Sequence, residues 1–137
     1  MATVTQATDI TTHWVTSWNR HDPSAIVACL AEGGTYTDPA TPAISGEALA
    51  GYAATYFQAF PDLVFDTLNI VDGGAGVTVL HWRARGTFTG PLGEVAPTGN
   101  ALSISGVDVI TVEGDHIRSV EGYWDQVTLR EQMGLGG

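Results

Sequence analysis

The sequence contains no lysine and only one cysteine. Its five arginines stand against fifteen acidic residues, so the formal net charge is -10. A chain this acidic repels nucleic-acid phosphates and anionic lipid surfaces, and we expect neither as a partner. The single cysteine, Cys29, cannot form an internal disulfide. Its place in an apolar helical run favours a buried thiol over a nucleophile.

Long apolar runs are also missing. No stretch of eighteen apolar residues occurs, so we expect no membrane-spanning helix. The first residues lack the basic and then apolar pattern of a secretory signal, so we expect a cytoplasmic protein. The 137 residues are 44% hydrophobic and 15% charged, which suits one globular domain over residues 1–137 with a sizeable core.

Motifs for metal binding and nucleophilic catalysis are absent. The four histidines and the acidic residues show no ligand spacing such as HxxxH or CxxC, and no GxSxG occurs. The glycine-rich segment at 73–76 lies between two predicted strands, so it reads as a turn and not as a phosphate loop. The sequence therefore indicates chemistry without a metal or another cofactor.

Three helices are predicted in the first part of the chain. The first covers Asp9–Asn19, with an apolar stripe in four-residue steps. Asp22 and Pro23 open a second, short helix that Gly33-Gly34 would end, followed by a brief extended piece at 35–38 and a loop at 39–45. The third helix opens at Ser45 and closes at Pro61-Asp62.

The period of the apolar residues changes to that of strands after residue 62. Four strands are predicted, with glycine-containing turns between them: Leu63–Val71, Val77–Thr87, Ala101–Val112 and Ile117–Trp124. A short helix over 127–132 follows. The order predicts an α+β fold, in which three N-terminal helices pack on a strongly curved antiparallel sheet.

The strand at 101–112 carries an acid in an apolar row. Four apolar residues fall on one side at period two, and Asp108 is in step with them: Leu102, Ile104, Ile110 and Val112. A buried carboxylate must be protonated, hydrogen-bonded or chemically employed, because an unpaired charge there is costly. The alternative is a reversed register that places Asp108 outside.

The strand at 77–87 has apolar residues on both sides. This pattern indicates that helices cover one side and that a second copy of the chain covers the other, so a homodimer is predicted.

Acid–base chemistry in a mostly apolar pocket remains as the candidate function. The catalytic candidates are four titratable residues: Asp38, Asp108, His81 and Asp125. Asp38 precedes Pro39 and could equally form a turn with its own backbone, and Asp125 could equally begin a helix. His81 has the right ordinary pKa for a proton shuttle, but it could be packed or at the surface.

Several motifs resemble those of the SnoaL-like polyketide cyclases. They are WNRHD near the start, TYTDPAT, FPDL, the pair GTFTG and PTG, and YWDQVTLREQMG at the end. The resemblance runs over nearly the whole chain. It implies a cone-shaped, cystatin-like barrel with a deep apolar pocket, within a superfamily that includes ketosteroid isomerase and nuclear transport factor-like domains.

The resemblance carries the family's chemistry over only in part. The acid on the last strand of the cyclases aligns with Gly122, and the histidine of their GTH motif aligns with Phe88. The epoxide hydrolases pair an arginine with an aspartate, and here Arg83-Ala84-Arg85 lacks the acid. In the isomerase comparison Asp38-Pro39 aligns with the base and Asp108 with the oxyanion-stabilising acid, while Trp14 replaces a tyrosine.

The resemblance to ketosteroid isomerase implies a pair of acids that hold different protonation states, as they do in that enzyme. Asp38 would stay ionised as the base, and Asp108 would stay neutral and donate to an enolate. The ligand would be a small hydrophobic carbonyl compound between aromatic walls: Trp14, Trp18, Tyr36, Tyr56, Phe60 and Trp124. Two alternatives remain open, a binding module without catalysis and an interaction domain that pairs through the sheet.

Overall fold

The helices precede most of the sheet, as the sequence predicts. The computed structural model describes residues 2–136. In it the helices are α1 (Val4–Asn19), α2 (Pro23–Ala28), α3 (Gly46–Ala59) and α4 (Gln126–Met133). The strands are β1 (Leu30–Asp38), β2 (Thr41–Ile44), β3 (Val64–Gly74), β4 (Val77–Thr87), β5 (Ala101–Glu113) and β6 (His116–Trp124).

The six strands form one curved sheet in the order β2-β1-β6-β5-β4-β3. The α+β prediction is confirmed, and the sheet is open at both edges instead of closing into a barrel. Four of the strand pairs are antiparallel, but β1 and β6 run parallel, which differs from the fully antiparallel sheet that the sequence predicts. Parallel pairing is possible here because a long path through α3 and four strands separates β1 from β6.

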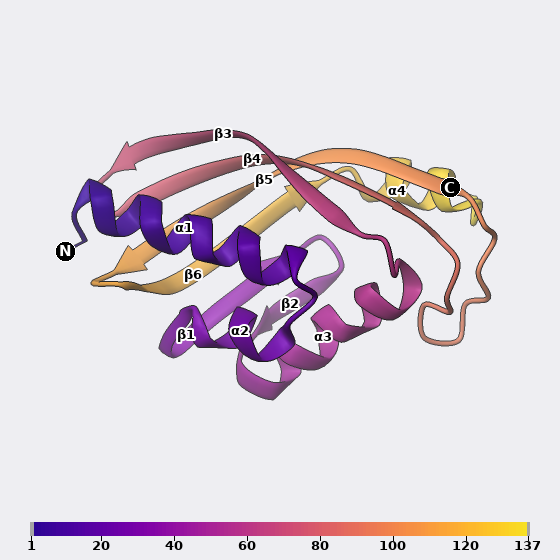
Figure 1. Ribbon diagram of the computed structural model, residues 1–137, viewed down its shortest axis with the longest axis horizontal. Helices are drawn as coiled ribbons and strands as arrows, with labels where there is room; N and C mark the ends of the chain where they lie inside the picture. The colour runs from indigo at the N-terminus through magenta and orange to yellow at the C-terminus, as the bar shows by residue number, and fades with distance from the viewer. Residues whose placement is uncertain (1, 137) are drawn as a thin grey trace.

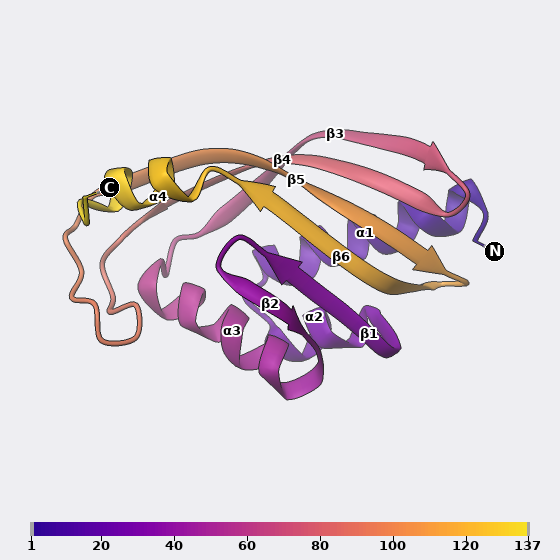
Figure 2. The same ribbon diagram turned by 180° about the vertical axis from the view of Figure 1, so that it is seen from behind.

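Helix α1 lies along the concave side of the sheet (Figure 1). It contacts β3, β4 and β5, while α2 packs on α3 below it. The reverse view shows β1 and β2 as a short ribbon beside β6, next to α3 (Figure 2). This arrangement places the apolar stripe of α1 directly over the inner face of the sheet, with Ile10, Trp14 and Trp18 all buried.

Two sequence predictions between 29 and 45 are wrong. The second helix ends at Ala28, and Gly33-Gly34 lies inside β1, where the pairing with β6 shifts register. A side chain on Gly34 would meet the Ile117 carbonyl oxygen at 2.8 Å, so these glycines mark a strand irregularity and not a helix end. The expected loop at 39–45 contains β2, whose proline is tolerated because β2 is an edge strand.

The predicted starts of α2 and α3 are confirmed, but only one of the two N-cap residues caps its helix with its side chain. The Asp22 carboxylate accepts the Ala25 backbone N–H at 3.1 Å, with Pro23 at the first helical position. Ser45 stands at the N-cap of α3, but its side chain makes no capping hydrogen bond.

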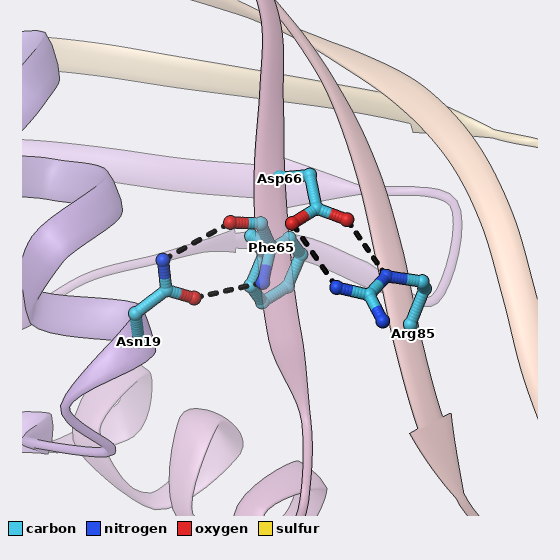
Figure 3. Close-up of polar contacts among 4 residues, drawn as sticks. All are labelled: Asn19, Phe65, Asp66 and Arg85. Carbon is cyan, nitrogen blue, oxygen red and sulfur yellow. Dashed lines mark hydrogen bonds and ion pairs between the residues drawn. The ribbon is translucent and has the colours of Figure 1, made fainter.

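Asn19 joins the end of α1 to β3. Its side-chain amide donates to the Phe65 carbonyl oxygen at 3.0 Å and accepts from the Phe65 backbone N–H at 2.7 Å (Figure 3). Beside it, Arg85 forms a bidentate ion pair with Asp66 on the exposed side (Figure 3). The amide pair fixes where α1 crosses the sheet, whereas an exposed ion pair contributes little to stability.

The inner face of β5 confirms the predicted register. Leu102, Ile104, Ile110 and Val112 are buried together with Asp108. On β4 the buried side is the one with Leu80 and Trp82. Within residues 2–136 no helix is both long and apolar enough to cross a membrane.

Gly106 on β5 has a backbone position that only glycine fits. A Cβ there would lie 2.5 Å from the Trp82 ring and 2.5 Å from the Tyr123 carbonyl oxygen. We therefore expect Gly106→Ala to displace the Trp82 indole and to lower the free energy of unfolding by about 1–3 kcal/mol. Urea denaturation checks this. Gly51→Ala on α3, where an added Cβ would meet nothing within 4 Å beyond its own helix backbone and chain neighbours, is the control and should stabilise slightly. Equal stabilities of the two variants would contradict the prediction.

Candidate active site

A cavity lies between the helices and the inner face of the sheet. Its volume is about 780 Å³, including the mouth that opens to solvent. The lining is aromatic and aliphatic apart from a few polar groups: Trp14, Val15, Trp18, Tyr36, Asp38, Tyr52, Tyr56, Phe60, Leu63, Phe65, Leu80, Trp82, Ala84, Leu102, Ile104, Asp108, Trp124 and Leu129. A concave, apolar site with a few polar groups is typical of small-molecule binding.

Asp108 is the buried acid of this cavity. It lies on β5 and is 8% exposed. One carboxylate oxygen, Oδ2, accepts the indole N–H of Trp14 from α1 at 3.1 Å. The other, Oδ1, accepts the indole N–H of Trp82 from β4 at 3.2 Å. Both oxygens therefore have a donor, which satisfies the expectation that a buried carboxylate is hydrogen-bonded.

Burial raises the pKa of Asp108 to about 6 from its ordinary value of 3.8. The two indole hydrogen bonds act in the opposite direction, and the nearby charge of Asp38 adds to the rise. Asp108 thus changes its protonation state just below neutral pH. The resemblance to ketosteroid isomerase implies a neutral Asp108 at pH 7, and the pKa shift has that direction but is smaller than the role requires.

Asp38 lies at the end of β1, where three donors surround it. Its Oδ2 accepts the hydroxyl of Tyr36 at 2.6 Å and that of Tyr52 at 2.7 Å. Its Oδ1 accepts the Ala40 backbone N–H at 2.7 Å, which is the turn that an aspartate before proline is expected to form. The Tyr52 hydroxyl also lies 3.1 Å from that of Tyr56.

The three tyrosine hydroxyls keep their protons. Burial raises the pKa of Tyr36 well above its ordinary value, and the charges of Asp108 and Asp38 raise it further. Burial is also the largest cause of the raised pKa of Tyr52 and of Tyr56. These groups are therefore neutral hydrogen-bonding partners across the physiological range.

Gly122 brings the two acids together. It pairs with Asp108 across β5 and β6. A Cβ at this position would lie 3.1 Å from Asp108 Oδ1, 3.4 Å from Asp38 Cβ and 3.4 Å from the Tyr36 hydroxyl oxygen. Because glycine has no side chain, Asp108, Asp38 and Tyr36 can approach one another here. A larger residue at this position would push them apart.

The six aromatic residues predicted as pocket walls all line the cavity. Two important lining residues were missed, Tyr52 and Trp82. Tyr52 lies one turn before Tyr56 on α3, so the four-residue spacing could have found it. Trp82 lies on the same buried side of β4 as Leu80 and Ala84, and the alternation along the strand is the signal that could have found it.

Two predicted catalytic residues lie elsewhere. His81 stands between Leu80 and Trp82, so its side chain points to the opposite face of the sheet from the cavity. Asp125 is exposed and caps α4, because its Oδ1 accepts the Val127 and Thr128 backbone N–H groups at 3.0 and 3.1 Å. Hydrogen bonds from Thr128 lower the pKa of Asp125, as a capping role requires.

Trp18 presents an unsatisfied donor. Among residues 2–136 its indole nitrogen has no hydrogen-bond partner although it is buried. Edge-to-face contacts with Trp14, Phe57 and Phe65 hold the ring. Over the same described range, no three histidine, cysteine or acidic side chains are grouped as metal ligands.

Comparison with known proteins agrees with this architecture. The family model described as SnoaL-like polyketide cyclase matches residues 8–133. No curated protein matches the chain.

Solved structures are similar in fold. TsrD from Streptomyces laurentii is 20% identical, with a TM-score of 0.82 over 98% of this chain and 99% of that one. A protein from Catenulispora acidiphila, described as having a ketosteroid isomerase-like fold in complex with trimethylamine, is 21% identical, with a TM-score of 0.77 over 92% of both chains. SalBIII, described as an epoxide hydrolase/cyclase-like enzyme in pyran ring formation, is 18% identical, with a TM-score of 0.77 over 92% of this chain and 95% of that one.

The buried position of Asp108 should make stability depend on pH. Because its pKa is higher in the folded than in the unfolded state, the folded protein holds the proton more tightly, and stability falls as pH rises from about 4 to about 6. Asp108→Asn removes this titration. The free energy of unfolding of the variant minus that of the wild type should rise across this window by about 1.4 kcal/mol per pH unit, about 3 kcal/mol in total.

Urea denaturation at half-unit steps from pH 3.5 to about 7.5 measures this difference. Taking the difference cancels the other titrating groups that the two proteins share. A constant difference over the window would show that Asp108 titrates normally.

Proposed function

Because this chain belongs to the SnoaL-like polyketide cyclase family, we propose that it is a cofactor-free acid–base enzyme that acts on a hydrophobic carbonyl compound. The reaction is a proton transfer next to the carbonyl group, leading to cyclisation or to isomerisation. The observation that carries the proposal is a buried carboxylate whose pKa is about 6, in the wall of an apolar cavity. A general base works best with a pKa near the working pH.

Asp108 is the better base of the two acids. Its oxygens each accept one indole N–H, which leaves acceptor capacity on both. Asp38 Oδ2 already accepts two hydroxyls and its Oδ1 a backbone N–H, so little capacity remains for a substrate proton. This assignment moves the role of base, which the isomerase comparison implies for Asp38, to Asp108.

The proposed reaction needs only this carboxylate and the cavity. The ionised Asp108 removes a proton from the carbon beside the carbonyl group, and the C–H electron pair forms the enolate. The protonated Asp108 then returns the proton to a different carbon in an isomerisation. In a cyclisation the enolate carbon attacks a second carbonyl of the same molecule, and Asp108 protonates the resulting alkoxide. The apolar walls exclude water, and positioned proton transfer contributes roughly two to four powers of ten in rate.

A binding module for small hydrophobic molecules is the second candidate. Two residues favour it, Gly122 and Phe88, because the resemblance aligns them with the acid and the histidine of the cyclases. Gly122 has no side chain, and Phe88 is fully buried, with its ring 5.4 Å from that of Phe60.

Exchange of carbon-bound hydrogen tests the enzyme without a known substrate. The wild type should accelerate deuterium uptake by 2-tetralone in D₂O, followed by proton NMR, and the rate should rise with pH through about 6 as Asp108 ionises. Asp108→Asn should lower the exchange rate at least about a hundredfold. Glu121→Gln, an exposed neighbour on β6, is the matched control and should leave the rate unchanged.

Two other outcomes would change the assignment. A large loss in Asp38→Asn with little loss in Asp108→Asn would return the role of base to Asp38. Binding of 2-tetralone without any exchange would favour the binding module.

The homodimer remains a proposal, and the outer face of the sheet supports it. Val79, Val107 and Val109 lie side by side there with Tyr123, which is 52% exposed. Light scattering of the wild type should give twice the mass of one chain, and Val109→Glu should give the mass of one chain because a buried charge would disrupt the contact. A wild type with the mass of one chain would rule the dimer out.

A further inference from the structure

The hydroxyl protons around Asp38 have a fixed direction. The Tyr36 and Tyr52 hydroxyls both donate to Asp38 Oδ2. Each tyrosine has one hydroxyl proton. Tyr52 has therefore no proton left for Tyr56, and in the 3.1 Å contact between them Tyr56 must be the donor.

All three hydroxyl protons thus point along one network toward Asp38. Because burial raises the pKa of each of these tyrosines, none of them ionises near neutral pH to reverse the order. The hydroxyl oxygens can therefore offer a ligand only their lone pairs, as hydrogen-bond acceptors. Tyr36 and Tyr56 keep the most acceptor capacity, since neither oxygen receives a hydrogen bond from another residue in the described part of the chain.

A ligand in the cavity meets these oxygens directly, because the three tyrosines and Asp38 all belong to its lining. A carbonyl or ether oxygen placed against them would bring two acceptors together, with no proton between them. A hydroxyl group would supply the missing proton. A buried acceptor left without a donor costs free energy, and a group that satisfies it gains discrimination over an analogue that cannot.

We propose that Asp38, Tyr36, Tyr52 and Tyr56 form a recognition site for a ligand hydroxyl group that donates its hydrogen bond to a tyrosine oxygen. The identity of the substrate rests on the proposed function. If that function holds, the substrate is a hydroxyl-bearing hydrophobic carbonyl compound. Its reacting carbon lies at Asp108 and its hydroxyl at the tyrosine cluster. Asp38 is then a positioning residue that sets the direction of the tyrosine protons.

Matched probes test this site. They are 2-naphthylmethanol, which can donate, and its methyl ether, which has the same ring and oxygen but cannot donate. Isothermal titration calorimetry of the wild type should show at least tenfold tighter binding of the alcohol. Similar affinities for the two probes, or no binding of either, would overturn the proposal.

Variants locate the preference. In Asp38→Asn the amide N–H₂ can donate to a tyrosine oxygen, so one tyrosine proton becomes free for the ligand, and the preference for the alcohol should fall below about threefold. Tyr52→Phe releases the Tyr56 proton and should reduce the preference in the same way. Tyr123→Phe removes a hydroxyl from the outer face of the sheet and should keep the full preference. Binding of the methyl ether by each variant shows that the cavity is intact.

The two proposals fail in different ways. A full preference for the alcohol in both Asp38→Asn and Tyr52→Phe would overturn the tyrosine site, whatever the exchange rate of 2-tetralone. A wild type that does not accelerate tetralone exchange but prefers the alcohol would overturn the proposed function and leave the hydroxyl site standing.

Discussion

Two indole N–H groups that meet at one buried carboxylate hold the structure around the cavity. Trp14 comes from a helix 94 residues before Asp108, and Trp82 from a strand 26 residues before it. Removal of either donor would leave a buried carboxylate oxygen without its partner, and such a loss is more costly than the hydrogen bond itself. The carboxylate therefore fixes α1 against the sheet and fixes two cavity walls at the same time.

The two acids of the cavity differ in burial and in hydrogen bonding. Asp38 is partly exposed and has three donors, two of them tyrosine hydroxyls. Asp108 is more deeply buried, and this burial raises its pKa although its two indole hydrogen bonds act in the opposite direction. Gly122 makes the proximity possible, because a side chain there would contact both acids. The absence of one side chain thus allows two carboxylates to lie close together in one cavity.

Membership in the family does not by itself decide the chemistry. The three solved structures named above are at most 21% identical to this chain, and their descriptions include an isomerase-like fold and an epoxide hydrolase/cyclase-like enzyme. On a shared fold the reaction depends on the groups in the cavity. Here the buried acid stands on β5, across from the β6 position where the resemblance to the cyclases places it.

Local chemistry in the sequence was sufficient for most of the elements. The four-residue stripe of α1, the Asp22-Pro23 start of α2 and the alternation on β5 each depend on near neighbours, so these elements and their buried faces could be predicted. The bounds were less accurate, since α1 begins at Val4 and not at the predicted Asp9. The same alternation placed Asp108 among core residues. The predictions at Gly33-Gly34 and at β2 are wrong because both segments depend on their place in the sheet. Pairing with a distant strand and position at a sheet edge cannot be read from neighbouring residues in the sequence.

Tertiary structure alone decided how the two acids are hydrogen-bonded. The sequence placed Asp108 in step with an apolar row, with a reversed register as the alternative, and Asp38 before a proline. It could not show that Trp14 and Trp82 donate to one acid, or that Tyr52 joins Tyr36 on the other. Hydrogen bonds between residues tens of positions apart depend on the curvature of the sheet and on the crossing of α1. For the same reason His81 and Asp125, equally plausible as isolated residues, lie outside the cavity.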